Sequence, residues 1–303
     1  MNIDSMKNNN KTTESLNINS KDIDTKSISD MISIFNNEDL KIINSINNSS
    51  VDIESIIREV VSSIQSGGKL IYVGAGTSGR IGVMDAAECM PTFGIDKDMV
   101  QGIIAGGDDA MFRSIEGAED KVNEIKNIIE RKKITASDMI IGISCSGGAK
   151  FVLEFLKLSK IIGASTALIT FNNIDNIDYV DRILRVDVGP EIIAGSTRMK
   201  SGTATKIILN MISTITMIRL NKTYGNYMVD LKVMNEKLFN RAVNITSSIT
   251  GLNQEKSKNL LSASNNYVKN AIVMHKLQIG FEESERVLEN CKGSLRAALD
   301  KEV

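Results

Sequence analysis

Five short apolar runs, each followed by a turn and usually by a helical pattern, constrain the fold of this chain more than any other feature. The runs are Leu70–Val73, Val100–Ala105, Met139–Ile143, Ser165–Thr170 and Ile183–Val188. They are apolar almost throughout, which is typical of strands buried on both faces of a sheet. Strands that alternate with helices form a parallel sheet. We therefore predict an α/β fold: a parallel sheet flanked by helices on both faces.

The clearest helical pattern precedes the first strand. Ile53, Ile56, Ile57, Val60, Val61 and Ile64 recur at helical spacing and form one apolar stripe, which ends at Gly67 and Gly68. Shorter patterns cover Ile28–Phe35 and Leu40–Ile46. Further helices are expected from the first turn through Glu88, from Gly107 through Ile129, near Phe151–Ile161 and over Ile207–Leu220.

These patterns divide the chain into three parts. Residues 1–27 are rich in Asn, Ser and Lys, and we expect a loosely ordered N-terminal arm. Residues 28–251 hold the predicted sheet domain with its N-terminal helices. A break at Gly251 precedes amphipathic pieces that suit a small C-terminal helical bundle over residues 252–303.

Charge and residue usage exclude several classes of function. Lys and Arg total 36 and Asp and Glu 37, which argues against a nucleic-acid or membrane surface. Cys89, Cys145 and Cys291 lack the spacing of a zinc site or a disulfide framework, and we expect cytosolic thiols and no metal. With no signal peptide or membrane span apparent, we expect a cytoplasmic protein. His275 is the only histidine, so acid–base chemistry has to come mainly from Glu, Asp, Lys or Tyr.

The segment Gly74–Gly79 follows the first strand and opens a helix. It matches the GxGxxG pattern of dinucleotide-binding turns, and Asp108 or Asp109 lies in range for the acidic residue of that pattern. That acid, however, lies beyond a pair of glycines rather than at a strand tip. The turn also carries two hydroxyls, which a pyrophosphate-binding turn does not need. These differences favour another ligand.

The segment Ser144–Gly148 is a second turn of this kind, again between a strand and a helix. Strand ends, helix N-termini and hydroxyls together bind phosphate, and such loops meet at the carboxyl edge of a parallel sheet. Two of them fit a phosphosugar better than one nucleotide, although ordinary capping is the alternative for each. The candidate ligand-binding residues of the two turns are Gly76, Thr77, Ser78, Gly79, Ser144, Ser146 and Gly147.

A third segment, Gly189–Lys206, places a Gly-Ser-Thr cluster before a long helix. Lys200 and Lys206 lie near the first turns of that helix, where cations oppose the helix dipole. Their presence indicates an anionic ligand. We add Glu191, Ser196 and Lys200 to the predicted substrate-binding residues.

With these segments in view, the sequence resembles the N-acetylmuramic acid 6-phosphate etherases, a family with the sugar isomerase (SIS) fold. The resemblance runs from about Ser15 to the C-terminal helices. Its most specific stretches are GAGTSGRIGVMDAAECMPTFG (Gly74–Gly94), AGGDDAMFRSIEGAED (Ala105–Asp120), GPEIIAGSTRMKSGTATK (Gly189–Lys206) and GNYMVDLKVMNEKL (Gly225–Leu238). It implies a SIS-type α/β/α sandwich, release of D-lactate and N-acetylglucosamine 6-phosphate without metal or nucleotide, and a homodimer with its site near the interface.

The resemblance also implies the catalytic residues. Glu88 matches the glutamate of the family's Glu-Cys-Pro-Pro-Thr stretch and would be the acid, whereas Glu119, in Glu-Gly-Ala-Glu-Asp, would be the base. The ether lies β to the aldehyde of the open-chain sugar, so loss of the carbon 2 proton permits elimination. A protonated Glu88 needs a raised pKa. Apolar neighbours that can bury it are Ile81, Val83, Met84 and Met90.

The sequence departs from the family pattern in the second turn. Where the family reads Ala-Ser-Gly-Arg-Thr-Pro, this chain has Cys145-Ser146-Gly147-Gly148-Ala149-Lys150, so the Arg, Thr and Pro are absent. Met90 also replaces a proline. The first departure concerns phosphate binding and substrate preference rather than the reaction.

Three alternatives share the fold. A phosphosugar aldose–ketose isomerase also removes a carbon 2 proton, but it needs no acid for a leaving ether. A non-catalytic phosphosugar sensor such as the glucokinase regulatory protein is about twice as long. A SIS transcription regulator carries a basic helix-turn-helix, which the N-terminal arm does not show. The stretch around Glu88 favours the etherase.

Overall fold

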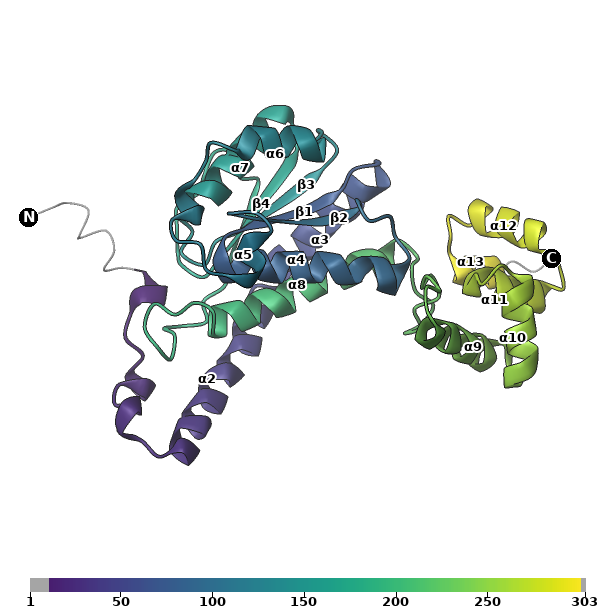
Figure 1. Cartoon of the computed structure of the whole chain (residues 1–303), viewed down its shortest axis with the longest axis horizontal. Helices are drawn as coiled ribbons and strands as arrows, with labels where there is room; N and C mark the ends of the chain where they lie inside the picture. The colour runs from purple at the N-terminus through teal and green to yellow at the C-terminus, as the bar shows by residue number, and fades with distance from the viewer. Residues whose placement is uncertain (1–10, 301–303) are drawn as a thin grey trace, which may run out of the picture. The chain divides into compact units, whose positions relative to one another are not determined.

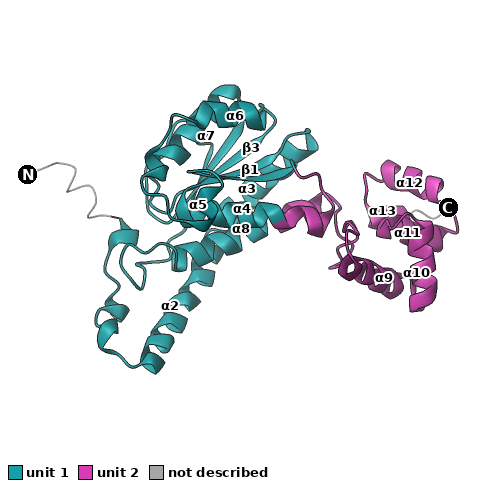
Figure 2. Ribbon diagram, viewed as in Figure 1, with its two compact units in different colours: residues 1–87, 98–213 teal, residues 88–97, 214–303 magenta. Residues whose placement is uncertain are grey.

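The computed structural model of the chain describes residues 11–300 (Figure 1). These residues form two compact units (Figure 2). The first comprises residues up to 87 together with 98–213, and the second comprises residues 88–97 together with the chain from 214 onward. Each unit has its own arrangement of elements.

The first unit is built on a five-stranded parallel sheet, as predicted. Its strands are β1 (Leu70–Gly74), β2 (Val100–Ile104), β3 (Met139–Ile143), β4 (Ser165–Thr170) and β5 (Arg182–Arg185). They lie in the order β2-β1-β3-β4-β5, and Tyr72 in the centre pairs with Gly102 and Ile141. The order places β1 and β3 side by side in the middle of the sheet. The turns that follow these two strands therefore open at the same edge.

Helices cover both faces of this sheet (Figure 1). On one face, α6 (Ile125–Lys132) and α7 (Lys150–Ile162) pack over Ile71, Val73 and Ile140 in one buried cluster. On the other face lie α3 (Ser50–Gln65) and α4 (Gly76–Phe93). The helix α4 comes so close to β1 that a Cβ atom on Gly82 would lie 3.0 Å from the Cβ atom of Tyr72. The predicted three-layer sandwich is confirmed.

Several predicted helices differ from the observed ones. The two patterns at 28–46 form one continuous helix, α2 (Ile28–Asn48), whose N-terminus is capped by Ser27. The single helix expected through Ile129 is instead α5 (Asp109–Phe112), a 3₁₀ turn η5 (Ala118–Asp120) and α6. Gly117, with φ 67°, lies in the left-handed region and interrupts it. The helix α8 (Lys200–Arg219) begins seven residues before the predicted start at Ile207.

The N-terminal segment is the largest correction. The expectation of a loosely ordered arm is wrong for residues 11–27, which form the 3₁₀ turns η2 (Thr12–Glu14), η3 (Ile18–Ser20) and η4 (Ile23–Thr25). Buried polar side chains tie this segment down: Asn17 donates to Glu38 Oε2 at 2.8 Å, and Ser20 donates to the Ile192 carbonyl at 2.7 Å. Residues 1–10 of the predicted arm lie outside the described residues.

Within the described part of the chain, the second unit contains five complete helices and the C-terminal ends of α4 and α8. The complete helices are α9 (Glu236–Thr250), α10 (Gln254–Ala263), α11 (Val268–Leu277), α12 (Phe281–Asn290) and α13 (Leu295–Asp300). One buried cluster joins Val243 of α9 to Leu261, Ile272 and Leu288. Gly251, at which we placed a domain boundary, is therefore a left-handed turn inside this helical unit. Between residues 11 and 300, no helix combines the length and apolarity needed to cross a membrane.

Candidate active site

A pocket of 430 Å³ lies in the first unit, at the carboxyl ends of β1 and β3. Five segments line it: the turn after β1, the turn after β3, residues 114–119 at the start of η5, Glu14 from the N-terminal segment, and the loop with Gly195 and Thr197. The lining residues are Glu14, Ala75, Gly76, Thr77, Ser78, Ser114, Ile115, Glu116, Gly117, Ala118, Glu119, Ile143, Ser144, Cys145, Ser146, Ala149, Gly195 and Thr197. The structure thus brings Glu119 and five of the predicted binding residues together.

In the turn after β1, three of the four predicted residues line the pocket. Gly76 has φ 52°, which favours glycine, and it starts α4, so the unpaired N–H groups of the first turn face this edge. Ser78 is buried, and its Oγ lies 3.5 Å from Cys145 Sγ in the other turn. Gly79 does not line the pocket. A Cβ atom there would lie 2.6 Å from Ile104 Cγ1, so this glycine allows close helix–strand packing instead.

In the turn after β3, the hydroxyls have different surroundings. Ser144 is buried, and its Oγ accepts a hydrogen bond from the Ala149 N–H at 3.2 Å. The half-buried Ser146 accepts from the Gly148 N–H at 3.2 Å. Gly147 does not line the pocket, and its N–H donates to the Ser144 carbonyl at 2.9 Å. The N–H that we expected Gly147 to offer a ligand is therefore already used within the turn.

Burial raises the pKa of the Cys145 thiol, which belongs to the turn after β3 and contacts Ser78 of the other turn. Hydrogen bonds with Ser78 and Thr197 act in the opposite direction and are outweighed by the desolvation. A thiol with a raised pKa is a poor nucleophile, because the thiolate is the reactive form. Cys145 thus contributes polar contact to the pocket rather than covalent chemistry.

The predicted base, Glu119, lies on the 3₁₀ turn η5 and is exposed. The left-handed Gly117 allows the sharp turn that brings η5 to the rim of the pocket. Glu116, one turn earlier, lines the same pocket and is also exposed. The position of Glu119, facing two hydroxyl-bearing turns, suits an acceptor for a proton of a bound sugar.

The N-terminal segment supplies a lining residue that the sequence did not indicate. Glu14 lies on η2, and its Oε2 is 3.2 Å from the position of a Cβ atom on Gly195. The adjacent Thr13 holds η2 in place, since its N–H and Oγ1 both bond to the Asn172 side chain and its carbonyl accepts from the Gly195 N–H. The sequence pattern around Gly195 indicated that this loop is part of a site. It gave no sign that η2 packs against the loop.

The predicted acid, Glu88, does not line this pocket. It lies in the part of α4 that belongs to the second unit, and it is exposed. The expectation that neighbouring apolar side chains bury it is therefore wrong for a single chain. One turn earlier, Asp85 is buried and accepts hydrogen bonds from Asn210 Nδ2 at 2.6 Å and Ser213 Oγ at 3.2 Å. Burial raises the pKa of Asp85, which is the effect that we predicted for Glu88.

The third predicted segment is mostly structural. Glu191 is fully buried and caps α8: its carboxylate accepts from the N–H groups of Lys200 and Ser201, both at 2.9 Å. Lys200 is also fully buried, and its Nζ donates to Glu38 Oε2 at 2.7 Å. Ser196 lies between two lining residues without lining the pocket itself. The cation at the start of α8 therefore pairs with a carboxylate of α2. This pairing explains the lysine at the helix start, which we had interpreted as a sign of an anionic ligand.

The charged side chains among the described lining residues of the pocket are all carboxylates. They belong to Glu14, Glu116 and Glu119, and no Lys or Arg of residues 11–300 lines the pocket. Among residues 11–300, no group of three or more His, Cys, Asp or Glu side chains is arranged to hold a metal ion. The groups available for chemistry in this pocket are thus carboxylates, hydroxyls and backbone N–H groups.

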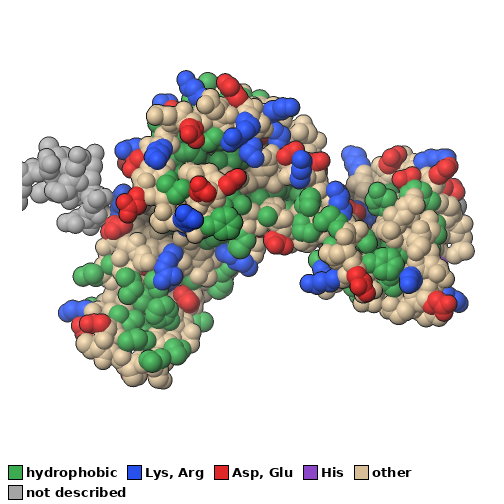
Figure 3. Space-filling model, in the orientation of Figure 1, with side chains coloured by type: hydrophobic (Ala, Val, Ile, Leu, Met, Phe, Trp, Pro, Cys, Tyr) green, Lys and Arg blue, Asp and Glu red, His purple; other side chains and the backbone are tan. Residues whose placement is uncertain are grey.

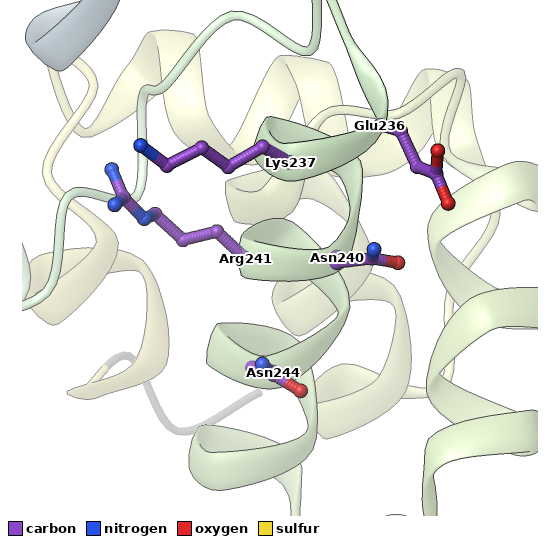
Figure 4. A pocket seen from close by; sticks show the side chains of 5 residues that line it. All are labelled: Glu236, Lys237, Asn240, Arg241 and Asn244. Carbon is purple, nitrogen blue, oxygen red and sulfur yellow. The ribbon is translucent and has the colours of Figure 1, made fainter.

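A second hollow, of 520 Å³, lies on α9 in the helical unit. It is lined by Glu236, Lys237, Asn240, Arg241 and Asn244. Figure 4 shows Lys237 and Arg241, one turn apart, extending to one side of the helix and Glu236 to the other. The helical unit thus presents positive charge here, although none of the predicted site residues lies in this hollow.

Comparison with known proteins places the chain in a family. Two family models match it: the N-terminal SIS domain of glucokinase regulatory protein over residues 52–160, and the C-terminal lid domain of the same protein over residues 225–292. The N-acetylmuramic acid 6-phosphate etherase 1 of Bacillus licheniformis is 44% identical over 95% of both chains. The N-acetylmuramic acid 6-phosphate etherases of Clostridium beijerinckii and Mycoplasma mycoides are also 44% identical, over at least 96% of each chain.

The chain belongs to the N-acetylmuramic acid 6-phosphate etherase family. The resemblance read from the four motifs is confirmed, and the etherases match nearly the whole chain rather than the SIS domain alone. A solved structure, the sugar isomerase domain of an RpiR transcription factor from Sphaerobacter thermophilus, aligns at 13% identity with a TM-score of 0.42. The alignment covers 63% of this etherase-family chain and 98% of the chain in that structure.

Proposed function

We propose that the pocket between the turns after β1 and β3 binds N-acetylmuramic acid 6-phosphate, and that the enzyme cleaves its D-lactyl ether there. Family membership supports the reaction. The observation that supports the site is the position of Glu119, whose turn lines the same pocket as Thr77, Ser78 and Ser146. Hydroxyls and a helix N-terminus suit the phosphosugar, and the carboxylate suits the proton transfer.

In the proposed mechanism, Glu119 takes the proton from carbon 2 of the open-chain sugar. The electron pair of that bond forms a double bond between carbons 2 and 3, and the bond from carbon 3 to the ether oxygen breaks. Glu88 of the second chain in a dimer gives its proton to the departing oxygen, because the Glu88 of the same chain does not line the pocket. This step releases D-lactate. Water then adds at carbon 3 and a proton returns to carbon 2, giving N-acetylglucosamine 6-phosphate. Atoms and charge balance without an oxidant, a metal or a nucleotide.

The test is release of D-lactate from N-acetylmuramic acid 6-phosphate, measured with the parent enzyme before and after exhaustive EDTA treatment. We expect equal rates. A Glu119→Gln variant should lose roughly 10²–10⁴-fold in rate and stop exchange of the carbon 2 proton of N-acetylglucosamine 6-phosphate with deuterated water. Glu88→Gln should lose lactate release but keep some exchange. The matched control is Glu116→Gln, which removes a neighbouring carboxylate of the same pocket and should remain active.

Two results would count against this assignment. If Glu119→Gln releases D-lactate at the parent rate, the pocket is misplaced. If Glu119→Gln keeps the exchange and Glu88→Gln loses it, the roles of acid and base are reversed. An aldose–ketose isomerase or a non-catalytic sensor would release no D-lactate at all.

We also propose that the enzyme is a homodimer that acts in the cytoplasm. The apolar side chains of Ile28, Ile32 and Phe35 recur at helical spacing on α2 and are exposed, as are Leu40 and Ile43 further along. Figure 3 shows hydrophobic side chains gathered over this helix. Ile28 and Leu40 are 77% and 71% exposed, and leaving such apolar side chains in water is unfavourable.

The proposed location in the cytoplasm is supported by the cysteines. The three cysteines among residues 11–300 are free, as is usual in a reducing compartment.

Light scattering after size-exclusion chromatography tests the homodimer. We expect the mass of two chains for the parent and of one chain for Ile32→Glu. Ile161→Glu, at a 74% exposed position on α7, is the matched control and should stay dimeric. A parent enzyme with the mass of one chain would contradict the proposed homodimer. Mixing the Glu88→Gln and Glu119→Gln variants adds a test of subunit cooperation, because activity returns only if each chain contributes one glutamate to a shared site.

A further inference from the structure

The pocket has an electrostatic problem that follows from the proposed function, on which this inference rests. A phosphate monoester carries about two negative charges near neutral pH. Within the described part of the chain, the residues that line the pocket include Glu14, Glu116 and Glu119, but no Lys or Arg. Helix N-terminal N–H groups and hydroxyls give partial positive charge only. A cation close to the turns would offset the repulsion between the phosphate and these carboxylates.

The N-terminal segment brings one cation to the second turn. Lys11 Nζ lies 3.9 Å from the position that a Cβ atom on Gly148 would occupy, and Ser146 Oγ lies 3.8 Å from the same position. The ammonium group and the Ser146 hydroxyl therefore flank one small open space. Ser146 itself lines the pocket, so this space lies beside it. Within residues 11–300, no carboxylate lies at ion-pair distance from Lys11.

Hydrogen bonds fix the backbone that carries this lysine. Lys11 directly precedes η2, and its carbonyl accepts from the Glu14 N–H at 3.0 Å. Thr13 is 1% exposed and bonds to Asn172, whose side chain also donates to the Cys145 carbonyl at 3.0 Å. One buried asparagine thus holds both η2 and the turn that contains Ser146. Lys11 is positioned by these contacts rather than by chance proximity of a long side chain.

Three other cations of the same unit are already engaged in contacts. Lys150 lies 3.1 Å from Asp120 Oδ1 in an exposed ion pair. The guanidinium group of Arg80 donates to the carbonyls of Met111 and Arg113. Lys200 is fully buried against Glu38. Each of these contacts would have to break before the cation could turn to a ligand, whereas Lys11 would not lose an ion pair with any described residue.

We propose that Lys11 binds the phosphate of the substrate together with Ser146, across the space that Gly148 leaves open. The glycine is essential to this arrangement, since a long side chain at 148 would enter the space beside the ammonium group. It also accounts for the departure in the second turn, where this chain has Gly148 at the position of the arginine in the pattern it resembles. The cation comes from the N-terminal segment instead of from the turn.

The experiment measures binding of N-acetylglucosamine 6-phosphate by calorimetry, because this product carries the phosphate and lacks the lactyl carboxylate. Lys11→Met should weaken binding roughly tenfold to a hundredfold, as expected for loss of a charge-assisted hydrogen bond. The difference should shrink at high salt, because the ammonium group is partly exposed. Lys26→Met, an exposed lysine on the same segment, is the matched control and should bind like the parent.

A second variant tests the space itself. In Lys11→Met/Gly148→Arg, an arginine grows from the position at which a Cβ atom meets nothing closer than 3.8 Å, so it fits without strain. We expect binding to return to within about threefold of the parent, since a guanidinium group replaces the ammonium group. Recovery by an arginine at 148 is a result that a purely structural role for Lys11 would not produce.

Equal affinity of the parent and Lys11→Met for N-acetylglucosamine 6-phosphate would overturn the proposal. So would a variant with weaker affinity for N-acetylmuramic acid 6-phosphate alone, because the lysine would then face the lactyl carboxylate. A parent that binds the product but releases no D-lactate would sink the proposed reaction only, as the binding measurement needs no turnover. A parent that binds neither sugar phosphate would overturn both.

Discussion

The two turns at the pocket and the segment Gly189–Lys206 look alike in sequence but differ in what surrounds them. Each combines glycine, hydroxyl residues and the start of a helix. Ser146 and Thr77 are half-buried and line a pocket, whereas Glu191 and Lys200 are fully buried and bond to other parts of the chain. The comparison teaches that residue type finds a helix start, and that burial and partners decide whether it meets a ligand.

The buried segment gives the largest expected effect. Lys200→Met leaves Glu38 without its buried cation, and removing one partner of a buried pair costs about 3–5 kcal/mol. We expect about 3 kcal/mol, the lower end, because Lys41, Asn17 and Asn19 still donate to Glu38. Denaturant unfolding measures this, and KM of the folded fraction should stay near the parent value.

Lys206→Met is the control for that measurement. Lys206 lies on the same helix but is exposed, so its loss should change the free energy of unfolding by less than about 0.5 kcal/mol. If Lys200→Met instead raises KM tenfold and leaves stability unchanged, the contrast between the two regions breaks down, and the lysine binds substrate as the sequence predicted.

Substitutions in the turn after β3, which lines the pocket, are expected to have a smaller effect. Ser146→Ala should raise KM roughly tenfold to a hundredfold, or about 1.5–3 kcal/mol, with little change in unfolding, because its hydroxyl is half-buried and faces the pocket. Ser144→Ala should differ. Its buried hydroxyl accepts from the Ala149 N–H before α7, so its loss should lower the free energy of unfolding by about 1 kcal/mol.

Steady-state kinetics and unfolding of both serine variants check this pair. Unchanged KM for both Ser146→Ala and Ser78→Ala would remove these turns from the substrate site. A loss of stability in Ser146→Ala as large as that in Ser144→Ala would show that the two hydroxyls play the same structural part.

The same contrast explains how far the sequence could predict the structure. The sheet followed from local apolar runs, and the turns at Gly74–Gly79 and Ser144–Gly148 followed from strand-to-helix transitions, so these predictions are confirmed. The pairing of Lys200 with Glu38 joins residues 162 positions apart, and the contact of Thr13 with Asn172 joins residues 159 apart. No local pattern encodes such partners. An Asn- and Ser-rich segment therefore looked loose although its polar groups are satisfied by the folded domain.

The pH dependence of stability gives the smallest and sharpest test of the buried region. Burial by itself would raise the pKa of Glu38, but hydrogen bonds from Lys200, Lys41 and two asparagines lower it to about 2 from 4.5. A carboxyl whose pKa is lower in the folded state stabilises the fold above about pH 4.5, and that stability disappears as the pH falls toward 2. Lowering the pH from 6 to 4 should therefore lower the free energy of unfolding by about 1 kcal/mol through this group alone.

Denaturant unfolding of the parent and of Glu38→Gln at both pH values isolates the contribution of Glu38, because the variant has no carboxyl to protonate at this position. The variant should be less stable than the parent at pH 6, and the gap should narrow by about 1 kcal/mol at pH 4. A gap that stays constant between the two pH values would mean that Glu38 is not the group held ionised by Lys200. The charge at the start of α8 would then have to be balanced elsewhere, and the description of this segment as a buried ion pair would fail.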